Sequence, residues 1–567
     1  MMHIWRIQKE IKLSVSRSLK IIAGREKLKT PPAELSDRIE IEIPKDHRHG
    51  DLSTNAAMRF ARHFALSPMK LAGFLQKELV PCMEKAGLGP VISDVKILPP
   101  GFINFRLSEA YLYSVLSGVI RKKSSFGKNN LGKLARVNVE FVSANPTGPL
   151  TVAHGRQAAV GDALSRILEF SGYRVTREYF INDVGTQIEL LGKSIHARYA
   201  ALNGVREDFP ADGYHGSYIN DIAGDFRREH GAKFTDNTSD NIWLISKYGV
   251  NAILKTIEDD LGRFGVIFGK WFSQSKLSEG EINRVLGLLR KKSYLYDRDG
   301  ATWFKSTAFG DDKDRVVVKS DGAFTYLAPD IAYHLDKHRR GFRKMIDIWG
   351  PDHHGYVKRL KASCQALGYG AESLSVLIVQ LATLYRDGTA LSMSTRKGEF
   401  VTLREVMDEV GCDVAKFFFL MRKLDSHLDF DLEVAKKNSL ENPVFYVQYA
   451  HARIASIQQF ADRMKSRLRR ARHNPGLLDK PEERLLLRML CQFPLIVMTA
   501  AGTLEPYGVL NFLNELAKVF HGFYTRHRVV DEADPPRTKA RLTLVNAVKI
   551  TLANGLGLLG ISFPDRM

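Results

Sequence analysis

Cysteine is scarce in this sequence. The 567 residues include four cysteines, Cys82, Cys364, Cys412 and Cys491, and no two of them have the CxxC spacing of a metal or redox motif. A disulfide framework and a zinc ribbon are therefore excluded, and a reducing compartment is expected. We expect a cytoplasmic protein.

Long apolar runs are also missing. The most apolar stretches, residues 374–384 and 493–504, contain polar residues or proline and fall short of the roughly 20 residues that cross a bilayer. Near the N-terminus, Ile4, Ile7 and Ile11 recur at helical spacing among charged residues, which predicts an amphipathic helix rather than a signal peptide. No membrane partner is expected.

Acidic residues are too few to balance the basic ones. The chain has 83 lysines and arginines against 63 aspartates and glutamates, a net charge of +20. Such an excess favours nucleic acid as a partner, because Lys and Arg release counterions from a phosphate backbone. A merely basic soluble enzyme is the alternative. The length also excludes a single small module, since domains usually contain about 100 to 200 residues.

Hydrophobic periodicity divides the chain into three units. Residues 1–115 alternate helical and strand patterns and predict an α+β unit, followed by a polar, basic stretch at 121–130 with the composition of an exposed linker. Residues 130–440 predict an α/β unit. Strand signals fade from about residue 404, so residues 441–567 predict a helical bundle.

The α/β unit begins with a strand–helix–strand pattern. A buried-strand pattern at 137–143 is followed by a turn at 145–149, a helix that ends at Gly172 and a second strand at 174–181. This predicts a parallel sheet with a right-handed crossover and a ligand at the first strand-to-helix junction. Residues 195–310 look like a helical insertion. Strands expected at 315–319, 345–349 and 376–379 would resume the alternation.

The first strand-to-helix junction has the composition of an anion site. Gly148 and Gly155 allow a close backbone approach, and His154 lies in the first helical turn, where free amide donors favour phosphate. The P-loop and dinucleotide fingerprints are both absent. An ordinary turn with a solvated His154 is the alternative.

Several motifs in order carry a family resemblance. They are VEFVSANPTGPLTVAH at 139–154, EYFINDVG at 178–185, GAFTYLAPDIAY at 322–333, WGPDHHGY at 349–356 and NPVFYVQYAHARI at 442–454. Together they resemble arginyl-tRNA synthetases, which are class I aminoacyl-tRNA synthetases, over nearly the whole chain.

The resemblance implies an activity and a fold. It implies ATP-dependent activation of L-arginine to an adenylate and transfer of the arginine to tRNA(Arg), with Mg²⁺ but no tightly bound protein-ligated metal. It also implies a Rossmann-like catalytic core at 130–440 with an insertion, an N-terminal α+β tRNA-recognition domain at 1–115 and a helical anticodon-binding domain at 441–567. A tRNA requirement for activation, which many members have, is carried over, and a monomer is expected.

The resemblance assigns the catalytic and ATP-binding positions. Thr151 stands where the first of two signature histidines belongs and His154 is the second; losing the first imidazole would raise the barrier by about 1 kcal/mol. A second signature loop has Ser392 and Thr395 at the positions of the usual lysines, so Arg396 and Lys397 would supply its cations. The ATP-binding positions are Gly148, His154, Gly155, Gly350, Asp352, His353, Met393 and Ser394.

Carboxylates are expected to hold the substrate guanidinium, because its planar donors pair bidentately with them. Asp330 and Tyr326 match the family's pair, and Asp297 stands where Glu is common. The alternative for Asp330 is helix capping after Pro329. The remaining arginine-binding positions are Glu140, Asn145 and His353. The tRNA-binding positions are Asn104, Tyr446, Tyr449 and Arg453.

Other functions are possible from the sequence alone. The adjacent His353 and His354 lack a third ligand at helical spacing, so a zinc site is disfavoured. An adenylating enzyme for another acceptor would change Asp330 and Tyr326, which are both present. A catalytically impaired tRNA-binding paralogue would have little reason to keep a guanidinium pocket. Arginine has few competitors of equal shape and charge, so the insertion need not edit.

Overall fold

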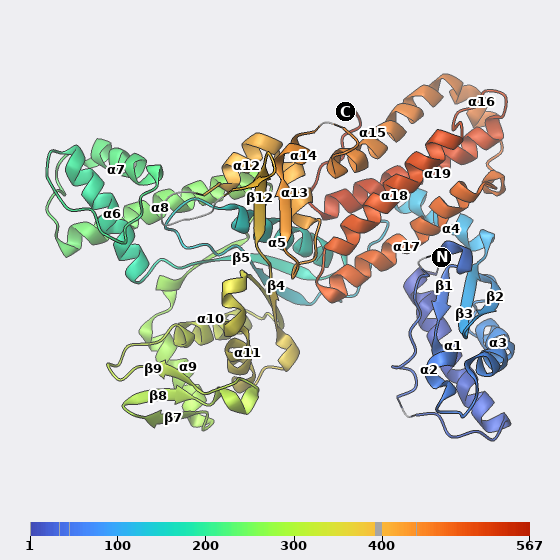
Figure 1. Cartoon of the computed structure of the whole chain (residues 1–567), viewed down its shortest axis with the longest axis horizontal. Helices are drawn as coiled ribbons and strands as arrows, with labels where there is room; N and C mark the ends of the chain where they lie inside the picture. The colour runs from blue at the N-terminus through green and yellow to red at the C-terminus, as the bar shows by residue number, and fades with distance from the viewer. Residues whose placement is uncertain (1, 33, 45, 392–399, 438) are drawn as a thin grey trace.

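A computed structural model describes residues 2–32, 34–44, 46–391, 400–437 and 439–567 (Figure 1). An N-terminal α+β unit, a central α/β unit with a parallel sheet and a C-terminal helical bundle follow one another along the chain. The predicted fold class is confirmed.

The N-terminal unit combines helices with a small antiparallel sheet. Its elements are α1 (Ile4–Arg25), β1 (Leu52–Thr54), α2 (Ala56–Ala61), α3 (Pro68–Lys85), β2 (Ile92–Leu98) and β3 (Phe102–Leu107), with strand order β1-β3-β2. The apolar stripe of α1 is buried, as its spacing predicts. Arg488 of the bundle pairs with the buried Asp51 (Nε–Oδ1 2.8 Å) and fastens this unit to it.

The stretch at 121–130 is mostly exposed, as predicted, but it is anchored to the rest of the molecule. Helix α4 (Glu109–Lys122) packs against two helices of the C-terminal bundle. Phe126 is fully buried and stacks on Phe493, and the side-chain amide of Asn554 donates to the carbonyls of Lys123 and Phe126. The polar composition therefore predicted the exposure but not the anchor, which consists of one buried aromatic side chain and two hydrogen bonds from the Asn554 side chain to backbone carbonyls.

Five parallel strands form the central sheet, in the order β11-β10-β4-β5-β6. They are β4 (Arg136–Glu140), β5 (Arg174–Ile181), β6 (Lys270–Ser273), β10 (Lys344–Trp349) and β11 (Leu374–Ile378). Helix α5 (Val152–Phe170) connects β4 to β5 and confirms the predicted crossover. The strand order reverses between β4 and β10, and ligands bind outside the carboxyl ends of the strands at such a reversal.

The region predicted as one insertion at 195–310 consists of two segments that leave the central sheet, one before β6 and one after it. They are called the first and second excursion. Helices α6 (Thr186–Leu202), α7 (Ser217–His230) and α8 (Ser239–Arg263) protrude at one side (Figure 1), and the chain then returns as β6. The second excursion contains α9 (Glu279–Lys291) and an antiparallel sheet of β7 (Leu295–Arg298), β8 (Ala301–Phe304) and β9 (Arg315–Val318). The strand expected at 315–319 therefore exists but lies outside the parallel sheet.

The second half of the central unit contains α10 (Leu327–Arg339) and α11 (Val357–Ala366) beside the sheet. After β11 come β12 (Ala382–Arg386), β13 (Thr389–Ala390), α12 (Leu403–Val410), α13 (Cys412–Leu420), β14 (Leu428–Asp431) and α14 (Leu432–Lys436). Strand β14 pairs in parallel with β12. The expectation that strands end near residue 404 missed it.

The C-terminal bundle consists of α15 (Pro443–Ala461), α16 (Lys465–Arg470), α17 (Pro481–Thr503), α18 (Tyr507–Arg526) and α19 (Pro535–Leu558). Within the described part of the chain, α17 alone is long and apolar enough to cross a membrane by length and composition. More than half of that stretch is buried, and the helix packs against α4, α18 and α19. Such burial is typical of a core helix, which passes the same test.

Candidate active site and RNA-binding cavity

The first turn of α5 holds His154 in one orientation. Thr151 is the N-cap residue, and its backbone N–H donates to His154 Nδ1 (3.1 Å), with Thr151 Oγ1 at the same distance from that atom. Burial lowers the pKa of His154 to about 4, so the ring is neutral at pH 7 and carries its proton on Nε2. Thr151 thus acts through His154, whose Nε2–H is a donor at a helix N-terminus.

Gly155 and Gly148, the two glycines near this turn, pack against different parts of the molecule. A Cβ on Gly155 would lie 2.7 Å from Leu403 Cδ1, so this glycine is needed for packing α5 against α12. A Cβ on Gly148 would lie 3.0 Å from the hydroxyl of Tyr218, which donates to the Thr147 carbonyl (2.7 Å). Tyr218 comes from α7, so the first excursion covers the turn at 145–149. Sequence patterns alone gave no signal for this contact.

The chain leaves β4 through a strained turn. Val142 and Ser143 have φ values of 68° and 39°, a left-handed conformation that is unfavourable for a β-branched residue and that clusters at functional sites. Ser143 Oγ donates to Glu140 Oε1 (3.2 Å) and accepts from the Phe180 backbone N–H (3.1 Å). The turn therefore fixes the two predicted ligands that flank it, Glu140 and Asn145.

Glu140 is buried at the carboxyl end of β4. Its Oε2 lies 2.5 Å from Lys337 Nζ, and while burial raises the pKa of Glu140, Lys337 opposes that rise. Asn145 is exposed, and its amide donates to Gln187 Oε1 (2.8 Å). Asn182 donates to Asn145 Oδ1 (3.3 Å). Neither Asn182 nor Gln187 was predicted as a site residue, although Asn182 lies within the EYFINDVG motif and Gln187 follows it by two residues.

Asp330 and Tyr326 lie one helical turn apart at the start of α10. Asp330 Oδ2 accepts a 2.5 Å hydrogen bond from the Tyr356 hydroxyl, and burial raises the pKa of Asp330. Tyr326 is 78% exposed. Tyr356 was missed as a site residue although it ends the WGPDHHGY motif. It links Asp330 to the segment that follows β10.

Asp297 does not join this pair. It lies on β7, at the edge of the small antiparallel sheet. Arg290 donates to both of its carboxylate oxygens (2.8 and 2.9 Å), and these hydrogen bonds lower the pKa of Asp297 to about 2. The exposed carboxylate of Asp297 is therefore already paired with a cation, and its contact with the substrate guanidinium stays a prediction.

The segment after β10 faces α5 across the strand-order reversal. A Cβ on Gly350 would lie 3.5 Å from the side chain of Gln157 in α5. Asp352 and His353 are exposed, with His353 Nε2 3.3 Å from Asp352 Oδ2. Within the described residues, no group of three or more His, Cys, Asp or Glu side chains is arranged to hold a metal ion. The predicted positions Met393, Ser394, Arg396 and Lys397 lie outside the described residues.

Arg156 is a buried residue that the sequence did not reveal. Its guanidinium donates to the carbonyls of Gln380 (2.6 Å), Lys423 (3.0 Å) and Ser426 (3.0 Å). Burial lowers the pKa of Arg156 to about 10, which leaves it charged at pH 7. It ties the helix that carries His154 to the connection before β12 and to the loop before β14.

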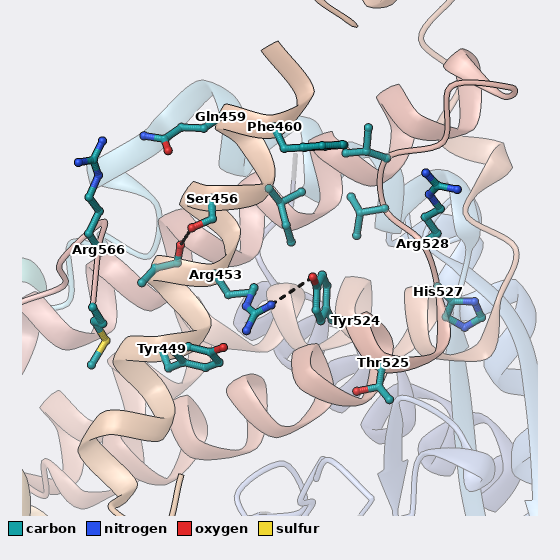
Figure 2. A pocket seen from close by; sticks show the side chains of 15 residues that line it. Tyr449, Arg453, Ser456, Gln459, Phe460, Tyr524, Thr525, His527, Arg528 and Arg566 are labelled. Carbon is teal, nitrogen blue, oxygen red and sulfur yellow. Dashed lines mark hydrogen bonds between the residues drawn. The ribbon is translucent and has the colours of Figure 1, made fainter. Parts of the chain in front are cut away.

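A second candidate site lies in the C-terminal bundle (Figure 2). A cavity of about 1060 Å³ is lined by aromatic and basic side chains, among them Tyr449, Arg453, Phe460, Tyr524, Arg528 and Arg566. The guanidinium of Arg453 lies over Tyr449 (4.8 Å) and Tyr524 (5.1 Å) and donates to the Tyr524 hydroxyl (3.3 Å). Aromatic faces beside free cations suit an unpaired base with its phosphate.

Two predicted RNA-binding residues lie elsewhere. Tyr446 packs against His521 (ring centroids 4.6 Å apart) and does not line the cavity. Asn104 is 4% exposed on β3, the middle strand of its sheet, so its side chain is not presented to RNA as expected. Phe102, at the start of the same strand, is 37% exposed.

Comparisons with known proteins match this geometry. Three family models cover most of the chain: "Arginyl tRNA synthetase N terminal domain" at 8–107, "tRNA synthetases class I (R), catalytic domain" at 116–209 and 233–424, and "DALR anticodon binding domain" at 447–567. The parallel sheet with its site at the strand-order reversal is therefore that of a class I aminoacyl-tRNA synthetase.

Curated relatives give the particular family. The chain is 46% identical over 531 residues to an arginine–tRNA ligase of Citrifermentans bemidjiense, covering 93% of this chain and 95% of that one, and 45% identical to that of Bacillus licheniformis. A candidate arginyl-tRNA synthetase structure from Campylobacter jejuni matches with a TM-score of 0.74 and 32% identity, covering 81% of this chain and 100% of that one. The Thermus thermophilus arginyl-tRNA synthetase structure, 20% identical over 99% of this chain and 100% of its own, supports the fold with a TM-score of 0.74. The chain belongs to the arginyl-tRNA synthetase family, which confirms the resemblance seen in its motifs.

Proposed function

We propose that this protein is an arginine–tRNA ligase that activates L-arginine with ATP and transfers it to the terminal adenosine of tRNA(Arg). The observation that carries the proposal is Asp330, a carboxylate in a half-buried side chain at the cleft. Its side chain has no basic partner among the described residues, only the hydroxyl of Tyr356. A buried carboxylate needs an opposite charge, and a guanidinium supplies one with matching geometry.

The first step requires phosphate stabilisation more than a general base. An arginine carboxylate oxygen attacks the α-phosphorus, the bond from that phosphorus to the bridging oxygen breaks, and pyrophosphate leaves with the bonding electrons. The N-terminus of α5 and the Nε2–H of His154 are donors placed for this charge. Arg396 and Lys397 would supply cations to the leaving group.

The substrate's other groups have candidate partners. Glu140 is assigned to the ammonium group and Asn145 to the carboxylate, with Tyr326 beside the guanidinium and His353 at the nucleotide side of the cleft. Ser143 holds one oxygen of Glu140, and Gln187 and Asn182 hold the amide of Asn145. Because these hydrogen bonds already hold Glu140 and Asn145 before a substrate binds, less conformational entropy is lost when they contact it.

Magnesium fits this site as an ion carried by the nucleotide. The phosphates of ATP are its preferred oxygen ligands, and Mg²⁺ usually keeps several waters. Asp352, exposed just after the carboxyl end of β10, has no lysine or arginine partner among the described residues. The ion would neutralise charge on the phosphates during the first step.

The C-terminal cavity supports anticodon recognition, with bases stacking on Tyr449 and Tyr524 and phosphates meeting Arg453, Arg528 and Arg566. We assign tRNA recognition also to the N-terminal unit, and we place the enzyme in the cytoplasm as a monomer. A tRNA requirement for adenylate formation is part of the proposal.

Arginylation of tRNA(Arg) by the purified chain tests the function. We expect arginyl-tRNA and AMP in equal amounts, dependent on ATP and Mg²⁺. Pyrophosphate exchange into ATP should require arginine and be greater with tRNA present. Folded protein that gives neither charged tRNA nor exchange would refute the proposal.

A further inference from the structure

Three carboxylates stand side by side on the central sheet. Asp347 on β10, Glu140 on β4 and Glu178 on β5 occupy the same register, Asp347 opposite Glu140 and Glu140 opposite Glu178. Side chains at one register point to the same face, and neighbouring strands lie about 4.8 Å apart. All three are buried. This carboxylate row would repel itself strongly without nearby cations.

Helix α10 places a matching row of basic side chains over these acids. His334, Lys337 and Arg340 recur every three residues and therefore share one side of the helix. Lys337 is fully buried, and its Nζ lies 2.5 Å from Glu140 Oε2 and 2.9 Å from Asp347 Oδ1. Burial disfavours its charge, yet the carboxylates raise the pKa of Lys337 overall.

The other two basic residues bind the ends of the carboxylate row. Arg340 donates to both oxygens of Glu178 (2.7 Å each) and also reaches Asp336 at the surface. His334 Nε2 lies 2.9 Å from Asp347 Oδ2, and its Nδ1 lies 2.8 Å from the backbone carbonyl of Asp330. Both of these oxygens are hydrogen-bond acceptors, and the ring joins the carboxylate row to the backbone at the start of α10. Lys337 and Arg340 supply the fixed positive charges beside the row.

The carboxylate of Asp330 on α10 forms no bond with the basic row. Asp330 lies one turn before His334, so it shares the side of the helix that carries the basic row. Its carbonyl is the acceptor for His334, while its carboxylate bonds Tyr356 and meets no basic side chain among the described residues. The three basic side chains therefore bond the carboxylate row, and the Asp330 carboxylate at the start of α10 lies outside these bonds.

We propose that His334, Lys337 and Arg340, paired with the carboxylate row, position Asp330 for the substrate guanidinium and Glu140 for the substrate ammonium, with Lys337 as the central positioning residue. This rests on the proposed function. The network holds α10 to three strands through charged hydrogen bonds, which are short and directional. The Asp330 carboxylate takes no part in the bonds between the basic row and the carboxylate row, so it is left to pair with the arginine side chain.

The test compares two buried lysines. Lys337→Met removes the centre of the network without large loss of volume. Lys416→Met is the matched control, because Lys416 on α13 is also buried and its Nζ donates to the Gly560 carbonyl (2.8 Å). Arginylation by wild-type protein is measured in parallel; if the wild type is inactive, the proposed function fails and not this inference.

We expect Lys337→Met to raise the KM for arginine roughly ten- to hundredfold, since a displacement of about 1 Å has effects of that size. The KM for ATP should stay within about twofold. In Lys416→Met both constants should stay near wild type. Equal KM values for arginine in the wild type and a folded Lys337→Met, or equal increases in both variants, would overturn the inference.

A second pair of variants covers the case in which Lys337→Met does not fold. Arg340→Gln leaves Glu178 buried without its guanidinium, whereas the double variant Arg340→Gln/Glu178→Gln removes one charge of each sign. The single variant should raise the KM for arginine several-fold and the double variant should return it toward wild type, because balance is restored. An unchanged arginine KM in the folded single variant would contradict the proposed positioning.

Discussion

The proposed arginine site around Asp330 and the C-terminal cavity differ in the sign of their unpaired charges. At the first, the Asp330 carboxylate bonds the Tyr356 hydroxyl and has no basic partner among the described residues. In the cavity, Arg453 lies between two tyrosine rings, and Arg528 and Arg566 form no ion pair with any described acid. A single excess negative charge suits a small cation, whereas several cations beside aromatic faces suit a polyanion with bases. On the proposed function, these two regions would bind two substrates of opposite charge.

The largest effect should come from removing the excess charge of the cleft. Asp330→Asn should lower kcat/KM for arginine by about 2 × 10² to 5 × 10³-fold, because a buried ion pair that loses one partner costs about 3 to 5 kcal/mol. Steady-state arginylation measures this. Asp297→Asn is the control: its carboxylate pairs with Arg290 in an exposed setting, so it should change kcat/KM by less than about threefold. Equal losses in the two variants would place the guanidinium elsewhere.

The cavity gives the next largest effect. Tyr449→Ala should raise the KM for tRNA about five- to hundredfold, since stacking of one base contributes about 1 to 3 kcal/mol, while the KM for arginine in pyrophosphate exchange stays the same. Tyr446→Ala, which changes a residue outside the cavity, should have a smaller effect on tRNA. If the two variants weaken tRNA equally, the cavity is not the binding site.

Acid should weaken arginine binding at the cleft and not tRNA stacking. Burial raises the pKa of Asp330 above its ordinary 3.8, and only the ionised carboxylate pairs with a guanidinium. The KM for arginine should therefore rise as the pH falls through this raised pKa, at a higher pH than an ordinary carboxyl would show. The Asp330→Asn variant should lose this dependence. A pH profile that is the same in both proteins would assign the titration to another group.

The smallest effect concerns the orientation of His154. Thr151→Ala removes the hydroxyl beside Nδ1 but keeps the backbone donor, so the first step should slow by about fivefold, equivalent to about 1 kcal/mol. Thr151→Ser keeps the hydroxyl and should remain within about twofold. Single-turnover adenylate formation separates the two. No difference between the variants would mean that the hydroxyl does not orient the ring.

Much of the fold was predictable because it follows local periodicity. The β4–α5–β5 crossover comes from a buried strand, a helix with one apolar side and a glycine stop, all within one short segment. The strand β6 was missed since four residues, Lys270–Ser273, cannot establish an alternation within a charged helical region. β14 was missed for the same reason.

The site was predictable where a motif names its residues and unpredictable where charges pair across the fold. His154 and Asp330 stand in motifs, and the structure places them at the sheet's carboxyl edge. Asp297 stands at the sequence position where the family commonly has Glu, but in the structure its carboxylate pairs with Arg290. The ion-pair partner of a carboxylate cannot be predicted from the motif that contains it. Lys337 looks like a solvated lysine in the helical pattern, and only the register of three strands shows that it is buried over acids.

The charge at the cleft can be tested most directly by comparing L-arginine with L-citrulline, which replaces the guanidinium with a neutral group of nearly the same shape. In pyrophosphate exchange with tRNA present, we predict that arginine supports exchange and citrulline supports less than about 1% of it, since the loss of about 3 kcal/mol or more is a hundredfold effect. Equal exchange with both amino acids would contradict recognition by an unpaired carboxylate.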